Sequence, residues 1–167
     1  MEMSMVSSGW SGMSPEARLW IYVADQPLTS VQQEALASHF DAFLSAWDAH
    51  GAPVRGGWAL CLDRVFILAA EPAPTPPTGC AIDRSVASLR TLGDTLGVDW
   101  FNRHHIMYRV SPNAPWEHAQ LHAFWALRKA GRVTDTTEVL NTSAATMFEW
   151  LQSPAPCFAD SWHARMW

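Results

Sequence analysis

The chain has 167 residues, which fits a single domain with enough length to bury a core. Hydrophobic residues make up 49% and charged residues 16%, which excludes an intrinsically disordered chain. Eleven Lys and Arg stand against 16 Asp and Glu, a net charge of −5. This balance argues against nucleic acid or a membrane surface as a partner, because both attract a basic footprint.

The cysteines and the N-terminus predict a cytoplasmic location. Cys61, Cys80 and Cys157 are an odd number without CxxC spacing, which is typical of reduced thiols. The first residues lack a charged region followed by an apolar stretch, as a secretory signal has. The apolar run at residues 65–70 is far shorter than a membrane span.

Residues 1–15 show no periodicity, and we expect them to form a disordered leader before a single domain at 16–167. Residues 19–24 alternate like a strand with two packed faces. Thr29 or Ser30 then caps a helix, with Gln32 or Gln33 placed to close a capping box. Residues 58–62 and 65–70 predict a hairpin whose second strand is apolar on both faces, and therefore central in its sheet.

The second half of the chain predicts further elements. A Pro-rich loop at 71–78 leads to a helix at about 81–96, which Gly97 ends. Residues 105–110 alternate as a strand, and helices are expected at about 116–129 and 144–151. The tail at 153–167 looks irregular, but its tryptophans predict that it is ordered and packed on the domain.

The order of these elements predicts an α+β protein with a ferredoxin-like βαββαβ sandwich at 16–110. Both helices would cover one sheet face and leave an open face bearing Trp20, Tyr22 and Met107. Such a face is too apolar for water. We expect the helical extension at 111–167 to cover it, or a homodimer or protein partner to bind it. The ten tryptophans against two tyrosines fit either a bulky core or such an interface.

Several stretches resemble a family of short, uncharacterised bacterial proteins that often carry the label "ABC transporter ATPase". The most specific stretches are Gly79-Cys80-Ala81-Ile82-Asp83-Arg84-Ser85 and Ser161-Trp162-His163-Ala164-Arg165. The resemblance implies no activity, and it supplies candidate positions only. The sequence excludes an ATPase, because the single lysine, Lys129, lies outside any GxxxxGK[ST] loop.

The start of the helix near residue 80 is one candidate site. Cys80 would lie where free N–H groups favour a thiolate or an anion, with Asp83 and Ser85 in the first turn. The simpler interpretation is a turn glycine, a small buried Cys80 and a capping Asp83.

The second candidate is the tail, where His163 titrates near neutrality and Arg165 can hold a carboxylate or phosphate. The simpler interpretation is a structural latch in which Arg165 pairs with an acid such as Asp83. If the helix start binds an anion, one of four arginines should converge on it: Arg84, Arg103, Arg109 or Arg165.

His118 and His122 stand four residues apart, the spacing of a weak two-histidine metal site on a helix. A third ligand is not evident, and we expect neither a metal nor a cofactor. Two function hypotheses remain. The first is a small cytosolic module that binds a partner without catalysis. The second is a small enzyme or anion-binding protein with a site between Cys80–Ser85 and His163/Arg165.

Overall fold

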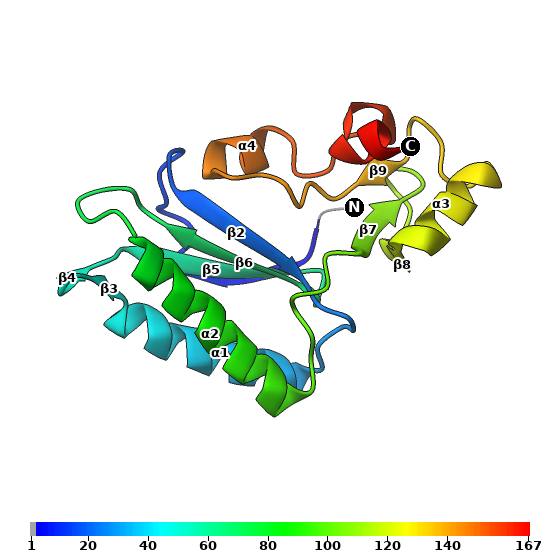
Figure 1. The fold of residues 1–167 in the computed structure, drawn as a ribbon. Helices are drawn as coiled ribbons and strands as arrows, with labels where there is room; N and C mark the ends of the chain where they lie inside the picture. Colours follow the sequence, from blue (N-terminus) through cyan, green and yellow to red (C-terminus); the bar gives the residue numbers. More distant parts are fainter. Residues whose placement is uncertain (1–2) are drawn as a thin grey trace.

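The computed structural model describes residues 3–167, and its main sheet has four antiparallel strands in the order β1-β5-β6-β2 (Figure 1). The strands are β1 (Met5–Ser8), β5 (Gly56–Cys61), β6 (Val65–Ala70) and β2 (Arg18–Val23). All six residues of β6 are buried, and the strand pairs on both edges. Its continuous apolar run therefore predicted an inner strand correctly.

Two long helices, α1 (Ser30–Ala46) and α2 (Gly79–Leu96), cover one face of this sheet (Figure 1). Thr29 and Gln32 form the predicted capping box at the start of α1. Gly97 ends α2 with a φ of 69°, a left-handed conformation that glycine adopts without steric cost. The side chains between helices and sheet form the first core, which includes Phe40, Trp58 and Phe66.

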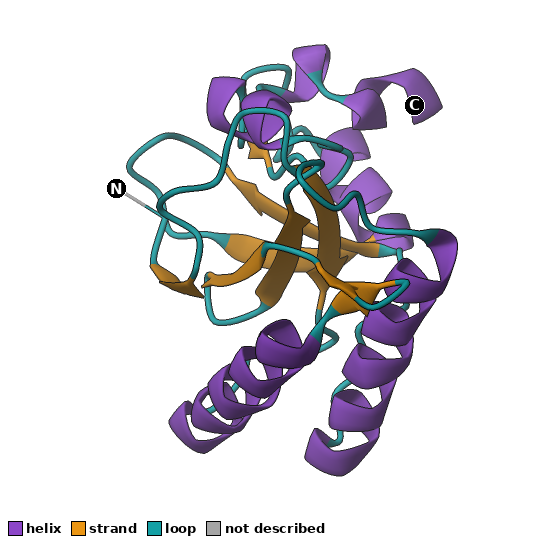
Figure 2. Cartoon of the chain, turned by 90° about the vertical axis from the view of Figure 1, so that its left-hand side faces the viewer, coloured by secondary structure: helices purple, strands orange, loops and turns teal. Residues whose placement is uncertain are grey.

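The C-terminal part of the chain covers the opposite face, as Figure 2 shows from the side. A small antiparallel sheet in the order β8-β7-β9 belongs to it, together with two short α-helices and two 3-10 helices. These elements are β7 (His105–Arg109), β8 (Glu117–Gln120), α3 (Leu121–Lys129), β9 (Glu138–Val139), α4 (Met147–Gln152), η1 (Phe158–Asp160) and η2 (Trp162–Met166). Met107, Leu140 and Trp150 of this part pack on the main sheet.

The α+β class is confirmed, but the sheet order does not give the expected ferredoxin-like arrangement. The strand at His105–Arg109 does not join β2; it pairs with β8 and β9 in the separate sheet. A strand from the expected leader, β1, extends the opposite edge of the main sheet by pairing with β5. Alternating residues indicate that a segment is a strand, but they do not indicate which strand it pairs with. Here β7 pairs with β8 and β9, which follow it in the chain.

The faces of β2 are also assigned differently from the expectation. Trp20 and Tyr22 pack toward the helices in the first core, whereas Leu19 and Val23 face the C-terminal part. The predicted two-residue alternation of β2 is confirmed. The prediction that Trp20 and Tyr22 lie on the face opposite the helices is wrong. An aromatic open face therefore does not exist in the described part of the chain.

Other differences are local. Residues 117–120 form β8, so the helix expected from 116 begins at Leu121. Asp48–Ala49 (β3) and Ala52–Pro53 (β4) form a short hairpin after α1 that the sequence did not predict. The tail is ordered, with His163 almost fully buried. No helix within residues 3–167 has the length and apolar character needed to cross a membrane.

Candidate binding site

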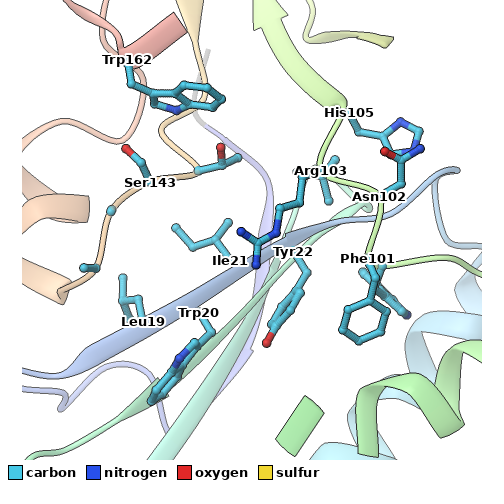
Figure 3. Close-up of a pocket in the computed structure, with 15 residues that line it drawn as sticks. Leu19, Trp20, Ile21, Tyr22, Phe101, Asn102, Arg103, His105, Ser143 and Trp162 are labelled. Atoms are coloured by element: carbon cyan, nitrogen blue, oxygen red, sulfur yellow. The ribbon is translucent and has the colours of Figure 1, made fainter. Parts of the chain in front are cut away.

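A cavity of about 500 Å³ lies along the outer edge of β2, where the two halves of the molecule meet (Figure 3). It is lined by residues 19–23 of β2, residues 100–103 after α2, residues 142–145 before α4, and the side chains of His105 and Trp162. Its position follows from the fold. In a ferredoxin-like sheet the fourth strand would pair with β2, but here β7 belongs to the separate small sheet, and β2 is an edge strand.

The outer edge of β2, which faces away from β6, has unpaired main-chain groups along this cavity in the described part of the chain. At one end Leu19 N–H donates to the Ala145 carbonyl (2.9 Å), and at the other Asp25 N–H donates to the Asp99 carbonyl (3.0 Å). Because strand residues alternate in direction, the N–H and C=O groups of Ile21 and Val23 point away from β6 as those of Leu19 do. Within residues 3–167 these groups have no hydrogen-bond partner.

Arg103 is the charged residue of the cavity lining. Its side chain extends over β2 between Ile21 and Tyr22 (Figure 3). It is exposed, and no carboxylate of the described residues forms an ion pair with it. Burial raises the pKa of the Tyr22 phenol, and the positive charge of Arg103 partly opposes that shift. The guanidinium therefore acts electrostatically on the floor of the cavity and is available to an anion.

Aromatic rings form much of the cavity wall. The rings of Tyr22 and Phe101 meet edge to face with centroids 5.7 Å apart, and the Arg90 guanidinium lies 4.2 Å from the Phe101 ring centroid. Trp162 lies on the opposite side of the cavity, near Ser143 (Figure 3), and stacks on His163. The Nε1–H of Trp162 is buried, and no described residue accepts a hydrogen bond from it. An unpaired buried donor of this kind costs stability.

His105 contributes a neutral imidazole next to Asn102 (Figure 3). Its Nδ1 lies 2.7 Å from Nε2 of His118 on β8. Burial lowers the pKa of both rings, with a further contribution from the positive charge of Arg64, and the pKa of His118 falls to about 4. Both imidazoles are therefore neutral at pH 7, and one donates a hydrogen bond to the other. The residues that line the cavity include the hydroxyl groups of Tyr22, Thr142 and Ser143 but no carboxylate or thiol.

The structure separates the two groups of residues that the sequence placed in one site. Cys80, Asp83 and Ser85 lie on the first turns of α2, beneath the main sheet (Figure 1). Thr78 caps that helix by accepting a hydrogen bond from Ala81 N–H. Cys80 and Asp83 are exposed, while the buried Ser85 donates to the Ile82 carbonyl. The main sheet lies between these side chains and the tail (Figure 1).

His163 and Arg165 belong to η2, on the opposite side of the sheet. The His163 ring packs against Phe124 and Trp162, and burial lowers its pKa to about 4. Arg165 is exposed and far from Asp83, so the expected latch between those two residues is not formed. The ordered tail is held by ring packing rather than by that ion pair.

The four arginines considered for an anion site do not converge. Arg84 pairs with Asp48 at the α1 end (3.1 Å), and Arg109 pairs with Glu138 on β9. Arg109 also lies 4.9 Å from the Trp116 ring centroid. Of the candidates, Arg103 lines the cavity beside β2. Its position there depends on tertiary structure, since nothing local in the sequence marks it.

The two-histidine metal hypothesis fails on its geometry. His118 lies on β8 and His122 in the first turn of α3, so they do not share one helix face. His118 instead contacts His105. Among residues 3–167 there is no group of three or more His, Cys, Asp and Glu placed to hold a metal ion.

Sequence reasoning also missed several parts of the cavity. Phe101, Ser143 and Ala145 belong to connecting segments that carry no recognisable motif. The available signal was the aromatic content of residues 20, 22, 100, 101 and 162, which fits a core or an interface equally well.

No protein-family model matches the chain. No curated protein and no solved structure matches it either. The resemblance to the short bacterial proteins labelled as ATPases therefore stays a prediction.

Proposed function

We propose that this chain is a non-catalytic binding protein and that its ligand site is the cavity along the outer edge of β2. The observation that carries this proposal is Arg103, an exposed cation without an ion-pair partner in residues 3–167, set over unpaired main-chain groups between aromatic walls. A volume of about 500 Å³ lies within the usual range of ligand cavities.

The chemistry of the lining favours a ligand with one carboxylate and an apolar or aromatic body. A guanidinium binds a carboxylate through two parallel N–H···O bonds, which a neutral ligand cannot reproduce. Tyr22, Phe101 and Trp162 offer ring surface to the rest of the ligand.

The experiment is calorimetric titration with N-acetyl-L-phenylalanine as the probe, compared with its methyl ester. We expect the free acid to bind and the Arg103→Ala variant to bind it about tenfold more weakly, the loss of roughly one charge-assisted hydrogen bond. Arg165→Ala is the matched control, because it removes an exposed arginine outside the cavity. Equal binding by the acid and the ester, or equal losses in the two variants, contradicts the proposal.

The alternative of an enzyme or anion-binding protein with a site between Cys80–Ser85 and His163/Arg165 is not favoured by any observation. The two groups lie on opposite sides of the main sheet (Figure 1). A homodimer through an open aromatic face is not part of this proposal, because the C-terminal part of the same chain packs on the second face of that sheet.

A further inference from the structure

We propose that the ligand of this cavity is the C-terminal end of a partner polypeptide, which adds to β2 as a short extra strand and places its terminal carboxylate on Arg103. This inference rests on the proposed function, because it specifies the ligand class of the same site.

The unpaired groups of β2 have the spacing of a strand template. Ile21 and Val23 each present one N–H and one C=O toward the cavity, two residues apart, without a partner in the described part of the chain. A small aromatic acid satisfies at most one of these positions. An extended peptide satisfies alternating donors and acceptors with its own main chain, as peptides do when they add to a sheet edge.

The chain itself already uses both ends of this edge. Ala145 accepts from Leu19 N–H, and Met147 N–H donates to the Ala17 carbonyl, so residues 145–147 run beside the beginning of β2. Asp99 accepts from Asp25 N–H at the other end. The free stretch between them spans about four residues, or roughly 13 Å of strand. Because both ends of this stretch are already paired, it fits the end of a polypeptide better than a segment that continues past it in both directions.

The walls select the shape and charge of the occupant. Residues 100–103 and residues 142–145 flank the edge on its two sides, which leaves room for one extended chain rather than for a second folded sheet. Arg103 is the charged group of the lining, so the occupant carries a single negative charge there. Side chains that alternate along such a peptide would meet Tyr22 and Phe101 on one side and Ile21 on the other.

The test uses acetylated tetrapeptides of the sequence Ala-Val-Ser-Phe, titrated into the whole protein by calorimetry. The free acid is compared with the C-terminal amide and with peptides that carry one N-methyl group at successive positions. We expect the wild type to bind the amide about tenfold more weakly than the free acid. Arg103→Ala should bind the acid and the amide with the same weak affinity. N-methylation should weaken binding about tenfold at alternate positions and have little effect between them.

The outcomes separate this inference from the proposed function. If N-acetyl-L-phenylalanine binds through Arg103 and N-methylation has the same small effect at every position, the cavity binds carboxylates and strand addition is wrong. If the acid and amide peptides bind equally, recognition of a chain terminus is wrong. If the edge is instead occupied by a second copy, sedimentation shows a dimer that the peptide does not dissociate, and the inference is also wrong.

Discussion

The two faces of the main sheet are covered in different ways. On the helix side, Trp47 Nε1–H donates to the Ala81 carbonyl and Trp58 Nε1–H to Asp41, both at 2.9 Å, whereas Trp100 Nε1 is buried without a partner among residues 3–167. On the C-terminal side, three buried atoms have no hydrogen-bond partner within residues 3–167: Trp116 Nε1, Trp162 Nε1 and His163 Nδ1. Buried unpaired polar groups cost free energy, and more of them lie on the C-terminal side. We therefore infer that the C-terminal side is the less stable layer.

Element length reinforces this difference. The helix side consists of two helices of 17 and 18 residues, whereas α3 and α4 have 9 and 6 residues. Long helices place many side chains on one packed face, and short elements leave connecting segments to complete the core. The cavity lies where these two layers meet along β2. The following predictions test the contrast, from the largest expected effect to the smallest.

Removing a ring from the helix side should cost the most. Phe40 is fully buried and packs against Phe43 and Phe66. Phe40→Ala should lower the free energy of unfolding by about 3–5 kcal/mol, measured by urea denaturation. Phe158→Ala is the matched change in the C-terminal layer and should cost less, because short elements can collapse into the space. A larger cost for Phe158→Ala contradicts the comparison.

Deleting residues 161–167 removes η2 and the buried His163 ring. We expect a loss of about 2–4 kcal/mol, comparable with removal of one buried aromatic side chain. Amide exchange should accelerate in residues 105–160 and change little in α1 and α2, because the lost contacts belong to the C-terminal layer. Equal acceleration in α2 would show that the two layers open as one unit.

Acid should destabilise the protein through His163. Its folded pKa is about 4 against a usual value of 6.5, so the unfolded chain binds more protons between these pH values. The contribution of His163 to the free energy of unfolding is therefore fully present above pH 6.5. It falls as the pH drops toward 4, by up to about 1.4 kcal/mol per pH unit. The lowered pKa of His118 acts in the same direction.

The variant His163→Phe should flatten this pH dependence, and thermal denaturation between pH 4 and pH 7.5 measures it. His104→Gln is the control, because His104 is exposed. A pH dependence that is unchanged in His163→Phe would mean that His163 is not the group responsible.

The smallest effect is expected at the start of α1. Thr29→Ala removes the side chain that accepts from Gln32 N–H and breaks the capping box. The loss should be about 1 kcal/mol by urea denaturation. Thr29→Ser preserves the hydroxyl and should restore most of it.

Local patterns explain which parts of this fold could be predicted from the sequence. The capping box, the Gly97 end of α2 and the apolar run of β6 depend on neighbouring residues, and all three were correct. The partner of β7, the pairing of β1 and the side of the sheet covered by the helices depend on contacts between distant segments. Alternation within a strand carries no information about these contacts.

The same distinction applies to the site. Arg103 was named from the sequence only as one of four arginines, and it reaches the cavity because β7 leaves the edge of β2 open. The motifs around Cys80 and His163 looked specific, yet the fold places them on opposite faces. Residues 142–145 form a wall of the cavity without any motif.

The open edge of β2 is the central claim, and amide hydrogen exchange by NMR tests it most directly. In the free protein Ile21 and Val23 should exchange rapidly, whereas Trp20 and Tyr22, whose N–H groups face β6, should exchange slowly. Adding the acetylated Ala-Val-Ser-Phe acid should slow exchange at Ile21 and Val23. Slow exchange of Ile21 and Val23 in the free protein would contradict the account, because it would mean that the edge is already paired.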